Sequence, residues 1–154
     1  MTLALKIPPA LLVLLTAGGM WLVARLLPGL DPGLPLVGRL ALGVTLGFTG
    51  MGIILAGVSA FRRHGTTVDP LHPEAASRVV RTGIYRRTRN PMYLGFTVAL
   101  LGWALGLGHP VALLLLPVFP LYLTRWQIQP EERALAAKFG DDFEAYLRDV
   151  PRWL

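Results

Sequence analysis

Two short polar segments of the sequence carry residue types that can bind charged ligands. The first, RTGIYRRTRNPMYLG (residues 81–95), places four arginines directly before Asn90-Pro91 and an apolar run. The second, QPEER (residues 129–133), contains the adjacent carboxylates Glu131 and Glu132. A helix start offers backbone N–H donors to a carboxylate or phosphate, and neighbouring carboxylates can bind a cationic or hydroxyl-bearing ligand. We therefore expect the chemistry of the chain at these two segments.

Each segment also has an ordinary structural explanation. Asn90 is a suitable helix N-cap, because its side chain can accept a hydrogen bond from a backbone amide, and Pro91 suits the first helical turn. Acidic residues such as Glu131 and Glu132 complement the dipole of a helix that begins before them. The arginines before Asn90 can contact lipid head groups. From these residues alone, both the binding interpretation and the structural one stay open.

The composition indicates an integral membrane protein. The chain has 154 residues, of which 53% are hydrophobic and only 16% charged. The net charge of +6 does not predict nucleic-acid binding, because the arginines cluster beside apolar runs, where membrane topology explains them. Absence of cysteine excludes disulfides and thiolate chemistry, and the scattered His64, His72 and His109 predict no metal site.

The hydrophobic runs predict an all-α, polytopic fold with about four transmembrane helices. We expect them at residues 7–27, 36–61, 91–107 and 111–127, the last two forming a short hairpin that need not cross the bilayer fully. The predicted parts of this single domain are two N-terminal spans (1–61), a basic loop (62–90), the hairpin (91–128) and amphipathic C-terminal helices (130–154).

The distribution of charge predicts the topology. Residues 62–90 contain seven arginines against Asp69 and Glu74, so the positive-inside rule places this loop in the cytoplasm. An even number of spans then puts both termini and both polar segments on that side, with the Asp31 turn outside. We expect a prokaryotic inner or plasma membrane protein. A transporter is disfavoured, because no ionisable residue lies in the middle of a span.

The two polar segments, taken with the tail, resemble a known family. GIYRRTRNPMYLG, the following hairpin and EERALAAKFGDDFEAYLRDVPRW resemble the isoprenylcysteine carboxyl methyltransferase-like membrane methyltransferases, a group that also includes phospholipid N-methyltransferases. The resemblance extends from Thr66 to the C-terminus. It implies an S-adenosylmethionine cofactor, with S-adenosylhomocysteine as product. The cofactor-binding positions that it implies are Tyr85, Arg89, Asn90, Pro91, Tyr93, Gly95, Glu131 and Glu132.

The charged and polar groups of S-adenosylmethionine can each be bound by residues of these types. Arg89 and the helix-start amides could bind its carboxylate, Glu131 or Glu132 its ammonium or ribose hydroxyls, and Tyr93 could pack on adenine. As catalytic candidates, Glu132 or Tyr122 could accept a proton from an amine acceptor, and Arg125 could hold an acidic one.

The resemblance thus implies methyl transfer to a lipophilic or membrane-embedded small molecule, with a carboxylate acceptor favoured over an amine or thiol. The alternative is a non-catalytic membrane protein that binds lipid head groups or packs with a partner subunit. The oligomeric state stays open.

Overall fold

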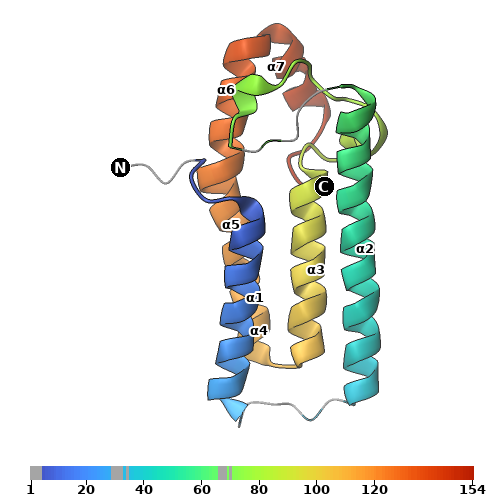
Figure 1. Cartoon of the computed structure of the whole chain (residues 1–154), viewed down its shortest axis with the longest axis vertical. Helices are drawn as coiled ribbons and strands as arrows, with labels where there is room; N and C mark the ends of the chain where they lie inside the picture. The colour runs from blue at the N-terminus through green and yellow to red at the C-terminus, as the bar shows by residue number, and fades with distance from the viewer. Residues whose placement is uncertain (1–4, 29–32, 34, 66–68, 70) are drawn as a thin grey trace.

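The computed structural model of the 154-residue chain describes all residues except 1–4, 29–32, 34, 66–68 and 70. Asp31, in the predicted outer turn, lies outside the described residues. Four helical columns run along one axis, and the shorter C-terminal helices cover one end (Figure 1). We refer to this covered end, which carries both polar segments, as the capped end.

The first three columns are single helices: α1 (Pro9–Leu26), α2 (Leu36–Arg63) and α3 (Pro91–Leu107). Proline lies at or near the N-terminus of each, where a missing N–H costs no intrahelical bond. Gly108, which follows α3, has a φ of 63°, a left-handed conformation that commonly ends helices at glycine. The helix bounds predicted from hydrophobicity therefore differ from the observed ones by at most two residues.

Helices α2 and α3 are antiparallel and approach closely through glycines. A Cβ added to Gly95 would lie 2.6 Å from the Gly50 carbonyl oxygen, and one added to Gly102 would lie 2.6 Å from that of Gly43. Side chains larger than hydrogen would therefore separate the helices at both points, so these glycines serve close packing. Gly95, predicted to bind cofactor, lies in this helix–helix contact.

The fourth column is a run of helical segments: α4 (Pro110–Leu115), α5 (Val118–Leu123), a π-helical turn η4 (Thr124–Ile128) and α6 (Gln129–Phe139). Pro117 and Pro120 have no N–H and therefore interrupt its hydrogen bonding. Because Pro130 has no N–H, the carbonyl of Trp126 has no donor four residues later. It accepts the N–H of Leu5 at 3.0 Å, which ties the segment before α1 to the π turn.

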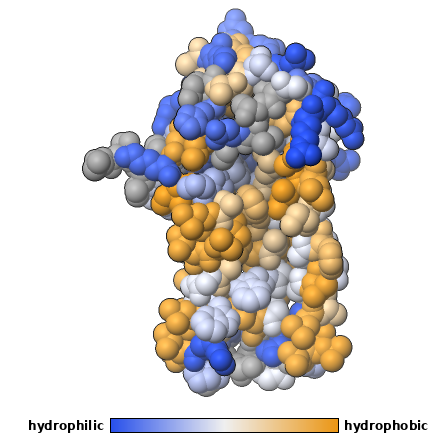
Figure 2. Space-filling view, in the orientation of Figure 1, coloured by the Kyte–Doolittle hydropathy of each residue, from blue (hydrophilic) through white to orange (hydrophobic). Residues whose placement is uncertain are grey.

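The buried core lies between α1, α3 and the fourth column. Its fully buried members are Met20, Tyr93, Leu100, Ala104, Ala112, Phe119, Leu123 and Ile128. Outward-facing side chains of the columns are largely apolar and exposed, including Leu14, Phe48 and Leu114. Hydrophobic residues cover the shafts, and hydrophilic ones gather at the capped end (Figure 2). This distribution is typical of a protein whose helical columns contact lipid.

Among the described residues, three helices are long and apolar enough to cross a membrane: α1, α2 and the run Pro110–Phe139. Helix α3 is a shorter apolar helix of 17 residues, or roughly 25 Å at 1.5 Å per residue, close to the ~30 Å hydrocarbon core. The predicted all-α membrane fold, with about four apolar helices followed by C-terminal helices, is confirmed.

The capped end is built by helix α7 (Asp141–Asp149) and the loop before α3, which includes the short turns η2 (Pro73–Ala75) and η3 (Gly83–Arg86). Phe143 and Tyr146 of α7 are buried, and the Tyr146 hydroxyl donates to the backbone carbonyl of Tyr85 at 2.8 Å. This contact fixes the basic loop against the C-terminal helices.

Gly140 ends α6 with a φ of 55°. Neither Asp141 nor Asp142 caps α7, because Gly140 occupies the N-cap and no side chain caps this helix. Asp142 instead accepts a hydrogen bond from Arg81 at 2.8 Å, which adds a second connection between α7 and the loop.

Candidate active site

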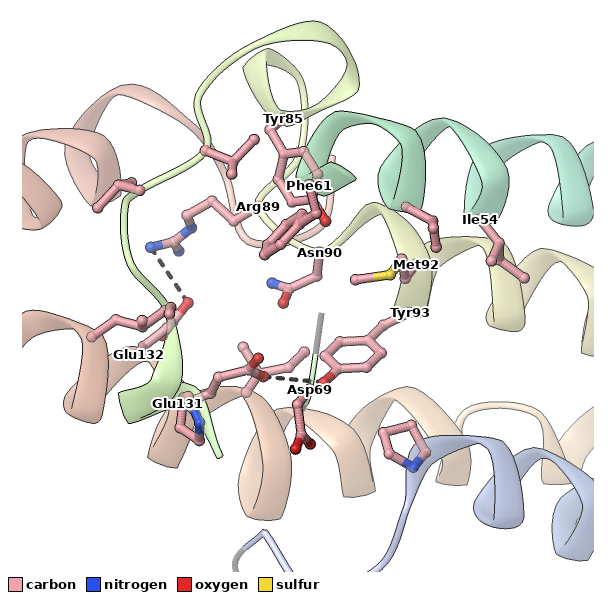
Figure 3. Close-up of a pocket in the computed structure, with 18 of the residues that line it drawn as sticks. Ile54, Phe61, Asp69, Tyr85, Arg89, Asn90, Met92, Tyr93, Glu131 and Glu132 are labelled. Atoms are coloured by element: carbon pink, nitrogen blue, oxygen red, sulfur yellow. Dashed lines mark hydrogen bonds and ion pairs between the residues drawn. The ribbon is translucent and has the colours of Figure 1, made fainter. Parts of the chain in front are cut away.

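A cavity of about 330 Å³ lies at the capped end, between α2, α3, α6, the start of α1 and the basic loop. Its volume falls within the roughly 300–1,000 Å³ that is usual for small-molecule sites. Of the eight predicted cofactor residues, six line it: Tyr85, Arg89, Asn90, Tyr93, Glu131 and Glu132. The two polar segments, about forty residues apart in sequence, therefore meet around one space (Figure 3).

Glu131 and Tyr93 form one side of the polar end of the cavity. The Tyr93 hydroxyl donates to Oε2 of Glu131 at 3.1 Å, which joins α3 to α6 across the cavity (Figure 3). The π turn immediately precedes α6, and such turns often occur where a helix must direct side chains into a site. Glu131 thus offers its carboxyl group to the cavity, oriented in part by the hydroxyl of Tyr93.

Glu132 has different partners. Its Oε1 lies 3.4 Å from Nη1 of Arg89, and its Oε2 lies 2.7 Å from Nη2 of Arg152. The side chains of Glu132 and Arg89 are only 14% and 13% exposed, so both charges are largely removed from water. The adjacent glutamates are therefore not equivalent: Glu132 is paired with two guanidinium groups, while Glu131 is hydrogen-bonded to a tyrosine.

The electrostatics of the surrounding groups follow from burial. Burial lowers the pKa of Arg89, opposed by the Glu132 carboxylate. The hydrogen bonds that Arg152 donates to Glu132 raise the pKa of Arg152. Burial also raises the pKa of Tyr85 well above its ordinary value, so its hydroxyl stays protonated. Within the described part of the chain, Nε of Arg89 and the Tyr85 hydroxyl are buried without hydrogen-bond partners.

Asn90 occupies the N-cap position of α3, but the prediction that its side chain caps the helix is wrong. Its Nδ2 donates instead to the backbone carbonyl of Arg152 at 3.0 Å. Pro91 is buried at the start of α3, near Gly57 of α2, and does not line the cavity. The first polar segment thus supplies both cavity-lining residues and residues that hold α3 in place.

Two residues predicted as catalytic lie elsewhere. Arg125 is exposed and donates weakly to Gln129 at 3.5 Å, and the ring of Tyr122 packs on Trp126 with a centroid distance of 4.8 Å. Neither lines the cavity. The π turn gives the reason: its extra residue rotates later side chains by about 100° around the helix axis, so Arg125 and Glu132 do not share a face.

Some residues at the site were not selected from the sequence. Arg152 binds Glu132, Thr88 is buried beside it, and Phe61 of α2 lines the cavity with its ring 5.1 Å from that of Tyr85. The sequence marks Arg152 only as one of several cationic residues in the C-terminal segment, and such residues are too common to identify a contact. Phe61 lies at the end of a predicted span, and its residue type alone does not mark it as a site residue.

Comparisons with known proteins identify a family and two similar proteins. The phospholipid methyltransferase family model matches residues 38–142. An uncharacterized protein of Haemophilus influenzae is 43% identical over 63 residues, which are 41% of this chain and 100% of that protein. The protein-S-isoprenylcysteine O-methyltransferase of Schizosaccharomyces pombe is 37% identical over 73 residues, 47% of this chain and 31% of that enzyme. No solved structure matches.

The chain therefore spans the whole of the bacterial relative and less than a third of the yeast enzyme. The family match runs from α2 to the start of α7, so it contains both polar segments and most of the residues that line the cavity. The resemblance identified from the sequence is confirmed. Because the match covers more than half of the residues, the protein belongs to the phospholipid methyltransferase family.

Proposed function

We propose that the protein transfers a methyl group from S-adenosylmethionine to a lipophilic acceptor at the membrane surface. The observation that carries this proposal is the composition of the single cavity described above. Its lining combines the polar side chains of Glu131 and Arg89 with the apolar side chains of Ile54, Val58 and Phe96. A site with this mixed lining suits a charged donor beside an acceptor that has an apolar part.

The donor set fits the charged groups of this cofactor. Nε of Arg89 and the Tyr85 hydroxyl are buried donors without partners in the described part of the chain, and such groups cost about 1–3 kcal/mol each. A ligand carboxylate would satisfy the guanidinium. Glu131 would accept from the ammonium or the ribose hydroxyls, and the ring of Tyr93 or Phe61 would pack on the adenine.

When bound, S-adenosylmethionine supplies an electrophilic methyl group on a sulfonium, which is transferred by in-line displacement. The residues of the chain contribute position and a dry environment. Arg89, in the loop before α3, and Glu131, on α6, would bind different polar groups of the ligand, which fixes its orientation. The side chains of Ile54, Phe61 and Phe96 exclude water from the apolar part of the cavity.

The chemistry of the acceptor decides whether a base is needed. A carboxylate acceptor is already ionised near neutral pH and needs none, whereas an ammonium must first lose a proton. In the described part of the chain, both guanidinium groups near the glutamates contact Glu132. Glu131 is therefore the better candidate to accept such a proton, in place of the Glu132 or Tyr122 suggested by the sequence. Arg125 is not part of the proposed site.

We place the cavity on the cytoplasmic side. The arginine-rich loop forms part of its wall, and the positive-inside rule assigns such loops to the cytoplasm. S-adenosylmethionine is made there. The same assignment places the segment before α1 and the C-terminal tail at the cytoplasmic face, since both lie at the capped end.

The test is the binding of S-adenosylhomocysteine to detergent-purified protein, measured by isothermal calorimetry. We expect a micromolar Kd, or about −8 kcal/mol, that is lost in Glu131→Gln. Glu144→Gln is the matched control, because Glu144 is an exposed acidic residue on α7 outside the cavity. Binding by the wild type then justifies transfer assays with methyl-labelled donor and extracted membrane lipids.

The competing function is a non-catalytic protein whose arginines contact lipid head groups. It predicts that a folded wild type binds no S-adenosylhomocysteine in detergent or in lipid nanodiscs, and that Glu131→Gln gives the same calorimetric result as the wild type. That pair of results would overturn the methyltransferase proposal.

A further inference from the structure

The backbone of Pro151 and Arg152, which we call the C-terminal clasp, is hydrogen-bonded to the loop that precedes α3. The Arg89 N–H donates to the carbonyl of Pro151 at 3.0 Å. The carbonyl of Arg152 accepts from Thr88 Oγ1 at 3.2 Å and from Asn90 Nδ2 at 3.0 Å. Three consecutive residues of the first polar segment are therefore held by two consecutive residues of the tail.

The side chain of Arg152 reaches the second polar segment. Its Nε donates to Oε1 of Glu132 at 3.1 Å and its Nη2 donates to Oε2 at 2.7 Å, a bidentate arrangement. This geometry is specific to arginine and orients the carboxylate as well as neutralising it. The clasp thus connects the start of α3 to α6 from outside the cavity.

Arg152 itself does not line the cavity, whereas Arg89, Asn90 and Glu132 all do. Any effect of Arg152 on a ligand must therefore pass through these neighbours. We propose that Arg152 is a positioning residue for the cofactor, which keeps Arg89 able to bind a carboxylate by taking up the charge of Glu132. This inference rests on the proposed function and adds a residue that lies outside the family match.

A count of charges gives the physical reason. Arg89 and Glu132 alone form a neutral pair, which has little attraction for an anionic group. Arg152 adds a second positive charge to the same carboxylate, so the three side chains carry a net charge of about +1 at neutral pH. The Glu132 carboxylate lies closer to Arg152, at 2.7 Å, than to Arg89, at 3.4 Å. Glu132 is thus held mainly by Arg152, and Arg89 retains donors for a ligand.

A purely structural role for the tail is the alternative, and the variants must separate the two. Arg152→Gln removes the charge, Arg152→Lys keeps it without the bidentate geometry, and Arg148→Gln removes an exposed charge of α7 that makes no contact with Glu132 in the described part of the chain. Gly43→Ala serves as a control for stability, because its Cβ would lie 2.8 Å from the Gly102 carbonyl oxygen at the far end of α2.

The affinity for S-adenosylhomocysteine is measured by calorimetry, and the thermal midpoint of each ligand-free variant is recorded in the same detergent. We expect Arg152→Gln to weaken binding about tenfold, equivalent to about 1.4 kcal/mol, with partial recovery in Arg152→Lys. Arg148→Gln should bind like the wild type. Gly43→Ala should lose thermal stability without losing affinity.

A double-mutant cycle with Glu132→Gln tests whether Arg152 acts through that carboxylate. We expect Arg152→Gln to cost little further affinity, and little further thermal stability, once Glu132 is neutral. The cycle in thermal midpoints can still be measured if a variant binds S-adenosylhomocysteine too weakly for calorimetry. Two results would overturn the positioning role alone. One is wild-type affinity in Arg152→Gln, and the other is that Arg152→Gln costs as much affinity in the Glu132→Gln protein as in the wild type. A folded wild type that binds no S-adenosylhomocysteine would overturn the proposed function as well.

Discussion

Replacement by glutamine should lower the free energy of unfolding much more at Glu132 than at Glu131. Glu132→Gln leaves the guanidinium groups of Arg89 and Arg152 without their shared carboxylate. Removing one partner of a fully buried ion pair costs about 3–5 kcal/mol. Because the Arg152 side chain is 33% exposed, water recovers part of that loss, and we expect about 2–3 kcal/mol.

Glu131→Gln replaces a buried carboxyl group and leaves no oppositely charged partner without its ion pair. Glutamine retains an oxygen that can accept the Tyr93 hydroxyl, so the 3.1 Å hydrogen bond can persist. We expect the free energy of unfolding to change by less than about 1 kcal/mol, while cofactor affinity is lost.

The assay is differential scanning fluorimetry of the ligand-free variants in one detergent. For a chain of this size, 1 kcal/mol corresponds to roughly 2–4 °C, so Glu132→Gln should lower Tm by about 4–12 °C and Glu131→Gln by less than about 4 °C. The exposed Glu144→Gln should leave Tm unchanged. Equal Tm losses for Glu131→Gln and Glu132→Gln, or a wild-type Tm for Glu132→Gln, would refute the assignment of ion pairs to Glu132.

Three further predictions concern residues around the site. Gly95→Ala should lower the free energy of unfolding by about 1–3 kcal/mol, because its Cβ would overlap the Gly50 carbonyl, and a retained wild-type Tm would contradict the close contact of α2 and α3. Thr88→Val removes a donor to the carbonyl of Arg152 and should cost about 1–3 kcal/mol by chemical denaturation; no loss would mean that this bond is not maintained. Arg125→Gln should bind S-adenosylhomocysteine within about twofold of the wild type, since a twofold change is only about 0.4 kcal/mol, and a larger loss by calorimetry would return Arg125 to the site.

The sequence was sufficient to predict the columns of the fold and the approach of the two polar segments. Hydrophobic run lengths determine the helices, and an even number of spans brings Arg89 and Glu131 to the same end. Those features depend on local composition and on chain connectivity alone. The helix break at Gly140 was predictable for the same reason, since it depends on the conformational freedom of a single residue.

Features that depend on tertiary contacts could not be predicted in this way. The amide of Asn90 faces the tail because the carbonyl of Arg152 is there to accept its bond, and no sequence pattern shows that. The exclusion of Arg125 from the cavity follows from one additional residue in a π turn, which changes the phase of all later side chains. Different roles for Glu131 and Glu132 follow from their neighbours, Tyr93 for one and Arg89 with Arg152 for the other.

The contrast between the glycine contacts and the proline-interrupted column has a mechanical consequence. Helices α2 and α3 touch backbone to backbone at Gly50 and Gly95, which leaves little room for either to shift. The fourth column has fewer internal hydrogen bonds near Pro117 and Pro120, so opening fluctuations should require less free energy there. We therefore expect the pair α2–α3 to be stiffer than the fourth column. Adjustment of the cavity to a bound molecule should displace α6 more than α3.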